Sequence, residues 1–200
     1  MRKIVVLMMV SLDGVMQAPG SPEEDTSGGF KYGGWTAPYS DEAIGTIINK
    51  ELSVPFDLLL GRKTYEIWVP YWPKQTGSIA DPFNEAKKYV VSDEAVDLTW
   101  KESILITGDV VAKLKALKAE DGPQLHVWGS SVLLQTLLKN DLVDELRLRI
   151  FPVTLGLGKR LFAEGTIPAA FELLDSTALP SGVILANYKR AGEVKTGSFA

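Results

Sequence analysis

The chain has 200 residues, 46% of them hydrophobic, a net charge of −4 and no cysteine. This size suits a single domain with room for an internal pocket. The acidic balance disfavours broad nucleic-acid binding, which depends on a basic surface. The absence of cysteine excludes disulfides, thiolate nucleophiles and cysteine-ligated metals, and we expect no metal site.

Residues 1–10 place two basic residues before an apolar run. Signal peptides share that order, but this run is short and no small-residue cleavage site follows it. Its apolar residues do not alternate with polar ones, which predicts a strand buried on both faces over residues 4–10. No later segment approaches the roughly 18 apolar residues that a membrane helix needs, so we expect a cytoplasmic protein.

Residues 11–38 are rich in glycine and proline and predict a long loop. Loops of that length are usually functional or disordered. The aromatic residues Phe30, Tyr32 and Trp35 favour a lid or pocket wall over a tether.

The following elements alternate between helices and strands. Ser40 is the expected N-cap of a helix that ends at Leu52. After it we expect a strand at 56–60, an irregular segment at 69–82, strands at 87–91 and 103–106, a helix at 110–118, a strand at 124–128 and a helix through residue 138. Such alternation predicts an open α/β sheet with helices on both faces.

The last third of the chain predicts strands at 143–151, 171–177 and 183–189 with no helices between them. The sheet should therefore gain an antiparallel edge. We expect one domain over residues 1–190 and a flexible tail over residues 191–200.

An apolar run stops at Gly61 and restarts at once as a helix opening with Arg62, Lys63 and Thr64. Glycine lets the backbone approach a ligand, and a helix N-terminus attracts anions. The pattern predicts a phosphate-binding turn; the alternative is an ordinary connection with solvated basic residues.

A second turn of the same kind follows the strand at 124–128, with Gly129, Ser130 and Ser131. Two such turns in one sheet predict a dinucleotide, because parallel strands end at the same edge. Ser92 ends another strand and adds a third candidate contact. The chain contains neither a P-loop nor a G-x-G-x-x-G fingerprint, so the scaffold must differ from both.

His126 is the only histidine and lies in an apolar strand, so we expect a core position. No histidine triad or histidine metal cluster is then available. Chemistry with so few acid–base groups favours a cofactor such as a nicotinamide, which carries the difficult step itself.

In order and spacing, Ser11-Leu-Asp-Gly14, Leu60-Gly-Arg-Lys-Thr-Tyr65, Val91-Ser92, Gly129-Ser-Ser131 and the block from Leu142 to Phe162 resemble the dihydrofolate reductase-like proteins. Within them, the chain is similar to the C-terminal reductase domain of bacterial bifunctional deaminase-reductases of riboflavin biosynthesis. The resemblance implies a three-layer αβα fold with a mainly parallel sheet of about eight strands and an antiparallel C-terminal edge. It also implies NADPH as cofactor and a homodimer. The cofactor contacts that it implies are Gly61, Arg62, Lys63, Thr64, Val91, Ser92, Gly129, Ser130, Ser131, Val132 and Leu133.

The sequence defines the residues that would bind the substrate less clearly than those that would bind the cofactor. Folate reductases carry a carboxylate on the helix before the Gly-Arg turn, and that offset falls near Gly45, where no acid is present. The weak catalytic candidates are Asp13, Asp41 and Glu145, each of which also has a plausible structural role. The substrate-binding candidates are Asp13, Trp35, Lys159 and Arg160.

These features predict an NADPH-dependent reductase that transfers a hydride to a small heterocyclic substrate. The activity expected from the resemblance is most like 5-amino-6-(5-phosphoribosylamino)uracil reductase. No H-x-E deaminase signature is present, so at most the reductase half is expected. The alternatives are a dihydrofolate or pterin reductase, a non-catalytic nucleotide-binding protein that keeps the fold, and a purely structural oligomer.

Overall fold

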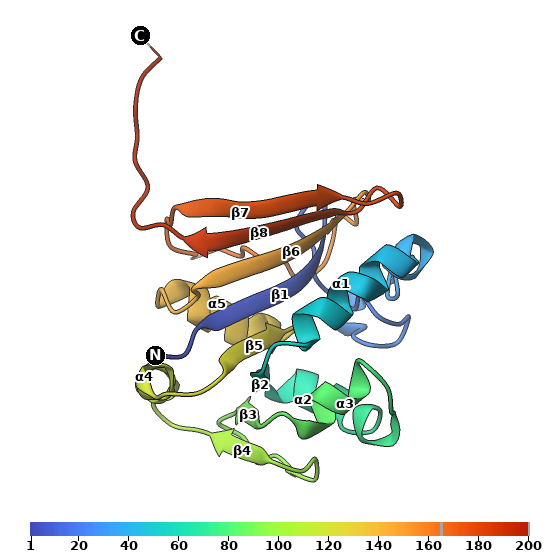
Figure 1. The fold of residues 1–200 in the computed structure, drawn as a ribbon, viewed down its shortest axis with the longest axis vertical. Coiled ribbons are helices and arrows are strands. Elements are labelled where there is room, and N and C mark those ends of the chain that lie inside the picture. Colours follow the sequence, from blue (N-terminus) through green and yellow to red (C-terminus); the bar gives the residue numbers. More distant parts are fainter. Residues whose placement is uncertain (165, 200) are drawn as a thin grey trace.

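The computed structural model describes residues 1–164 and 166–199 and contains one mixed sheet in the strand order β4-β3-β2-β5-β1-β6-β8-β7 (Figure 1). The strands are β1 (Ile4–Ser11), β2 (Phe56–Gly61), β3 (Lys88–Val91), β4 (Ser103–Ile106), β5 (Gln124–Trp128), β6 (Glu145–Phe151), β7 (Phe171–Ala178) and β8 (Ile184–Arg190). The helices are α1 (Glu42–Leu52), α2 (Arg62–Trp68), α3 (Ala80–Glu85), α4 (Val110–Ala119) and α5 (Ser131–Lys139).

The strands from β4 across to β6 run parallel to one another. Strand β8 is antiparallel to β6, and β7 is antiparallel to β8. The predicted α/β class, mainly parallel sheet and antiparallel C-terminal edge are confirmed. The sheet therefore brings the carboxyl ends of β2, β3 and β5 to one edge, where both glycine turns lie.

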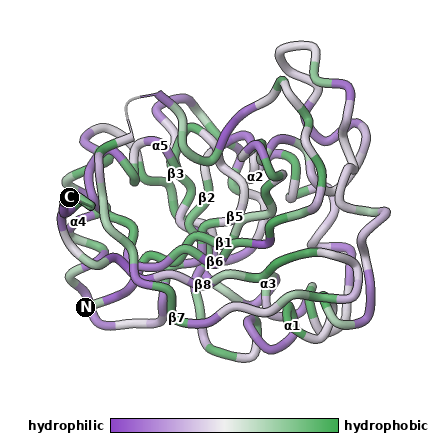
Figure 2. Tube along the Cα trace, turned by 90° about the horizontal axis from the view of Figure 1, so that it is seen from above, coloured by the Kyte–Doolittle hydropathy of each residue, from purple (hydrophilic) through white to green (hydrophobic). Residues whose placement is uncertain are grey.

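Helices cover both faces of the sheet, as predicted. On one face, Leu52 of α1, Tyr65 of α2 and Phe83 of α3 pack with Phe56 and Leu58. On the other face, Leu114 of α4 and Leu134 of α5 pack with strand residues. Figure 2 shows hydrophobic residues along the central strands and hydrophilic residues in the surrounding loops. Because both faces are covered, β1 is apolar from Ile4 to Val10 and shows no alternation.

The segment 11–38 packs against the body of the protein; it contains the short 3-10 turn η1 (Ser27–Gly29) and runs into a second, η2 (Ala37–Tyr39). Phe30 and Trp35 are buried in a cluster with Phe151 and Ile44. The Trp35 indole N–H donates to the Gln17 carbonyl at 2.8 Å. The two aromatic side chains therefore hold the loop against the domain.

Three local expectations were wrong in detail. The N-cap of α1 is Asp41 rather than Ser40, and its Oδ1 accepts from the Ile44 N–H at 2.8 Å. The segment 69–82 contains the 3-10 turn η3 (Trp72–Lys74) and the start of α3. The strand expected from residue 143 begins at Glu145.

His126 is fully buried and stacks on Phe56 with 4.4 Å between ring centroids, which confirms its predicted core position. Residues 191–199 are exposed and form no helix or strand (Figure 1); their flexibility stays a prediction. In the described parts of the chain, every helix is too short or too polar to cross a membrane.

Candidate functional site

A cleft of about 1070 Å³ lies at the carboxyl ends of β2, β3 and β5. This volume is slightly above the roughly 300–1,000 Å³ range of small-molecule pockets, so the cleft has room for a large ligand. All of the cofactor contacts expected from the sequence line it: Gly61, Arg62, Lys63, Thr64, Val91, Ser92, Gly129, Ser130, Ser131, Val132 and Leu133. We call these residues the clamp.

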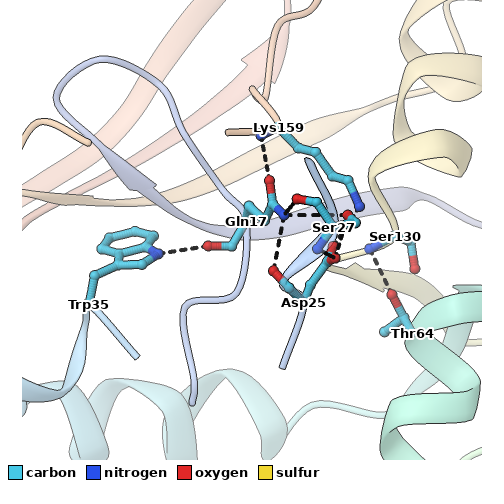
Figure 3. Close-up of polar contacts among 7 residues, drawn as sticks. All are labelled: Gln17, Asp25, Ser27, Trp35, Thr64, Ser130 and Lys159. Carbon is cyan, nitrogen blue, oxygen red and sulfur yellow. Dashed lines mark hydrogen bonds and ion pairs between the residues drawn. The ribbon is translucent and has the colours of Figure 1, made fainter. Parts of the chain in front are cut away.

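Hydrogen bonds join the two glycine turns directly. The Gly61 N–H donates to Ser130 Oγ at 2.9 Å. The Ser130 N–H in turn donates to Thr64 Oγ1 at 2.9 Å, the bond that Figure 3 draws. Gly129 has a φ of +58°, and a Cβ there would lie 3.3 Å from Thr64 Oγ1. Glycine therefore permits both the turn and its close approach to α2.

The N-terminus of α5 opens toward the cleft. Ser130 precedes the helix with φ +61° and ψ +52°, and its hydroxyl makes no cap hydrogen bond to the helix. That hydroxyl instead donates to the Trp128 carbonyl at 3.2 Å while accepting from Gly61. The first N–H groups of a helix have no partner within it, so those of α5 are available to an anionic ligand.

Two cations stand at the start of α2. The Arg62 guanidinium contacts Glu66 at 3.0 Å and Glu94 at 3.2 Å, and both carboxylates raise its pKa above the ordinary value. Lys63 is exposed and has no ion-pair partner among residues 1–164 and 166–199. Lys63 is therefore free to pair with a phosphate.

The end of β3 forms a tight turn at the far side of the cleft. The Ser92 hydroxyl donates to the Glu94 carbonyl at 2.8 Å and accepts from the Glu94 N–H at 3.0 Å. Asp93 accepts from the Gly108 N–H at 3.1 Å, which ties this turn to the segment after β4. The cleft thus extends across three strand ends.

The loop 16–27 forms another wall of the cleft. Gln17 holds it in shape: its Nε2 donates to the carbonyls of Asp25 at 3.0 Å and Ser27 at 2.9 Å, and its Oε1 accepts from the Lys159 N–H at 3.0 Å (Figure 3). Lys159 Nζ pairs with Asp25 Oδ2 at 2.5 Å. Burial alone would raise the pKa of Asp25, but hydrogen bonds from Lys159 and Ser27 outweigh it and lower the pKa.

Glu24 adds a second carboxylate to this wall. Its Oε2 accepts from the Gly20 N–H at 2.6 Å. Burial raises the pKa of Glu24 above its ordinary value, and the neighbouring charge of Asp25 acts in the same direction. Glu24 therefore keeps its proton to a higher pH than a solvated glutamate.

Comparison with known proteins identifies the family. The profile of the RibD C-terminal domain matches residues 2–185. The chain belongs to the RibD C-terminal domain family.

Two curated relatives come from Bacillus subtilis (strain 168). Uncharacterized protein YyaP is 27% identical over 192 residues, which cover 92% of each chain. Uncharacterized protein YwjB is 28% identical over 195 residues, which cover 95% of this chain and 99% of YwjB.

Solved structures share the fold. A putative riboflavin biosynthesis protein from Shewanella sp. PV-4 gives a TM-score of 0.66 at 21% identity and covers 94% of this chain and 99% of its own. A pyrimidine reductase-like protein from Corynebacterium diphtheriae gives 0.65 at 15% identity, covering 96% and 93%. Dihydrofolate reductase from Enterococcus faecalis, complexed with NADP(H), gives 0.59 at 15% identity, covering 94% and 96%. The resemblance to the dihydrofolate reductase-like fold is therefore confirmed.

Lys159 is the substrate-binding candidate that lines the described part of the cleft in this RibD C-terminal domain. Trp35 lies behind the loop, bonded to Gln17. Arg160 bonds the carbonyls of Asp13 and Gly156. Trp35 and Arg160 thus lie outside the cleft lining and hold loops together, and their contact with a substrate stays a prediction.

The three catalytic candidates also lie outside the set of cleft-lining residues. Asp13 accepts from the Ser11 hydroxyl and from the N–H groups of Leu155 and Gly156, which lower its pKa to about 2. Asp41 caps α1. Glu145 pairs with Lys3 and Arg147 at the start of β6, the end of the sheet opposite the cleft.

Sequence reasoning missed two parts of the cleft in this RibD C-terminal domain. The carboxylates of its loop wall are Glu24 and Asp25, which belong to an acidic triplet in a glycine-rich loop, and nothing in that local pattern indicated a role in a pocket. Its apolar part includes Trp68, Trp72, Phe83 and Trp128. No local sequence pattern could predict that these four rings lie together, because α2, η3, α3 and β5 each contribute one of them.

Proposed function

We propose that the protein is an NADPH-dependent reductase that transfers a hydride to a C=N or C=O bond of a small heterocyclic substrate. Membership of the RibD C-terminal domain family supports an oxidoreductase. The observation that carries the proposal is the pair of hydrogen bonds between Gly61, Thr64 and Ser130, which joins the two glycine turns at one end of the cleft.

The residues present fit a nicotinamide dinucleotide. Gly61 and Gly129 let the two turns lie close together, since a Cβ at Gly61 would lie 3.5 Å from the Ser130 side chain and one at Gly129 would lie 3.3 Å from Thr64 Oγ1. The uncapped N-terminus of α5 offers N–H groups to a pyrophosphate. Lys63 is free for a further phosphate, and Arg62 lies beside it.

The family resemblance suggests how the chain's own residues would hold the cofactor. Lys63 and Arg62 would bind the 2′-phosphate, Ser92 would contact the adenosine, and residues 129–133 would bind the pyrophosphate and the nicotinamide. The loop 16–27 covers the cleft and excludes water from the reacting atoms. When bound, NADPH supplies the hydride from its nicotinamide ring.

Titration with NADPH, followed by the change in protein and cofactor fluorescence, tests the proposal. We expect saturable binding and a weaker affinity for NADH, which lacks the 2′-phosphate. Lys63→Ala should weaken NADPH binding about tenfold and leave NADH binding nearly unchanged, because one charged hydrogen bond to phosphate is lost.

The matched control is Lys115→Ala, an exposed lysine on α4 that does not line the cleft. Its affinity for NADPH should equal that of the unaltered protein. Absence of saturable NADPH binding, or an equal loss in both lysine variants, would contradict the proposal.

A further inference from the structure

An aromatic wall lines the cleft beside the clamp. It consists of Trp68, Trp72, Phe83 and Trp128. Phe83 lies at its centre, stacked on Trp68 at 5.1 Å and edge-on to Trp72 at 5.0 Å and to Trp128 at 5.7 Å. The rings hold one another in place, so the wall is a preformed surface.

The wall continues directly into the clamp, because Trp128 precedes Gly129 in the chain. The three tryptophans are half-buried and so keep part of their ring surface toward the cleft. Ile48 of α1 and Met9 of β1 add further apolar lining. Such a surface favours a planar, apolar ring system, which can stack on the indoles and displace water.

The charged residues that line the cleft also favour an uncharged ligand beside the wall. Among the described residues that line it, the lysines and arginines are Arg62, Lys63 and Lys159. Arg62 and Lys63 belong to the clamp. Lys159 is paired with Asp25 at 2.5 Å, and Glu24 lies on the same wall.

A phosphorylated substrate therefore has no free cation outside the clamp in the described part of the cleft. Its phosphate would have to break the Lys159–Asp25 pair and lie beside two carboxylates. Like charges brought together out of water are strongly disfavoured. Arg160, the other basic candidate, is engaged with the carbonyls of Asp13 and Gly156.

We infer that the substrate is an uncharged, planar aromatic or conjugated heterocycle without a phosphate or carboxylate group, which stacks on the aromatic wall. The inference rests on the proposed function, because the wall adjoins the clamp in the same cleft. It departs from the phosphoribosyl substrate that the sequence resemblance suggested.

Riboflavin and FMN form a matched pair of probes, since they share one ring system and differ by a phosphate. Each is titrated into protein saturated with NADP⁺, so that the phosphate of FMN cannot occupy the clamp. We expect riboflavin to bind at least about tenfold more tightly than FMN. Trp68→Ala should weaken riboflavin binding about tenfold, whereas Trp68→Phe, which keeps a ring, should preserve most of it.

A third variant tests the charge argument. Asp25→Asn keeps the oxygen that accepts from Ser27 but removes the charge that neutralises Lys159. It should strengthen FMN binding about tenfold while leaving riboflavin binding nearly unchanged.

The outcomes separate this inference from the proposed function. A protein that fails to bind NADPH or NADP⁺ contradicts the proposed function, and the inference fails with it. Normal cofactor binding combined with FMN binding as tight as riboflavin binding contradicts the inference alone. So does binding of neither flavin, or riboflavin binding that Trp68→Ala leaves unchanged.

Discussion

His126 is a buried side chain whose two ring nitrogens lack hydrogen-bond partners in the described structure. Burial is the main reason that its pKa falls from 6.5 to about 3, and the charges of Arg147 and Arg149 add to the effect. The neutral ring therefore serves as a core side chain stacked on Phe56.

The pH dependence of stability follows from this shift. Between pH 6.5 and about 3 the unfolded chain binds a proton at His126 and the folded protein does not, so the free energy of unfolding falls as the pH falls. The slope is at most about 1.4 kcal/mol per pH unit. Between pH 7 and pH 5 the protein should lose about 2 kcal/mol more stability than His126→Phe. Urea denaturation of both proteins at the two pH values measures this, and parallel profiles would contradict it.

Single residues also show where sequence reasoning works. Gly61, Thr64 and Gly129 lie at or just after strand ends, and their neighbours in the chain are enough to predict turns at the edge of the sheet. Asp13 was a weak catalytic candidate, and its partners are the N–H groups of Leu155 and Gly156, far away in sequence. A role that depends on distant partners cannot be predicted from local pattern.

At the scale of elements, α2 and α5 are joined to neighbouring strands by one small group of hydrogen bonds. Thr64 on α2 accepts from the Ser130 N–H before α5, and Ser130 accepts from Gly61 at the end of β2. These contacts fix the spacing of the two turns before any ligand binds. A preformed clamp loses less conformational freedom on binding.

Thr64→Val tests this connection, because valine keeps the shape and removes the acceptor. The Ser130 N–H, in a left-handed backbone conformation, would lose its partner, so we expect a loss of about 1–2 kcal/mol in unfolding free energy. NADPH binding should weaken as well. Thr46→Val, at an exposed position on α1, is the control and should change stability by less than about 0.5 kcal/mol. Equal effects of the two substitutions in denaturation and binding experiments would show that the connection is unimportant.

The order of helices and strands could be predicted because apolar periodicity and turn residues are local signals. Helix α3 could not, since Pro82 lies within it and the segment before it contains Pro70 and Pro73. Pro82 is compatible with the helix because it lies in the first turn, where a backbone N–H has no hydrogen-bond acceptor within the helix. The aromatic wall was missed for a similar reason: Trp72 and Phe83 lie in and after the segment expected to be irregular.

At the scale of the whole molecule, the two edges of the sheet differ. Strand β7 is eight residues long and exposed along nearly its whole length, with Leu173 49% and Leu174 47% exposed. A long edge strand that exposes leucine side chains is a site at which sheets from two chains can pair. It supports the homodimer expected from the sequence, with β7 as the contact.

Light scattering coupled to size-exclusion chromatography tests this contact. We expect twice the mass of one chain for the unaltered protein and the mass of one chain for Leu173→Lys. The lysine would have to be buried in the dimer contact, and its charge opposes the pairing of two edge strands. The control is Ile104→Lys on β4, the other edge strand, where the side chain is 44% exposed. It should remain a dimer, and a monomeric unaltered protein would contradict the prediction.

Strand β1 lies at the centre of the sheet between β5 and β6, and Val5 is paired in register with both His126 and Glu145. On the ribosome, this apolar strand emerges long before either neighbour has been synthesised. Sheets built from such distant pairings fold slowly and leave apolar segments exposed in the meantime. Nascent chains that stop before β5 therefore carry a central strand with neither partner, and we expect them to bind chaperones.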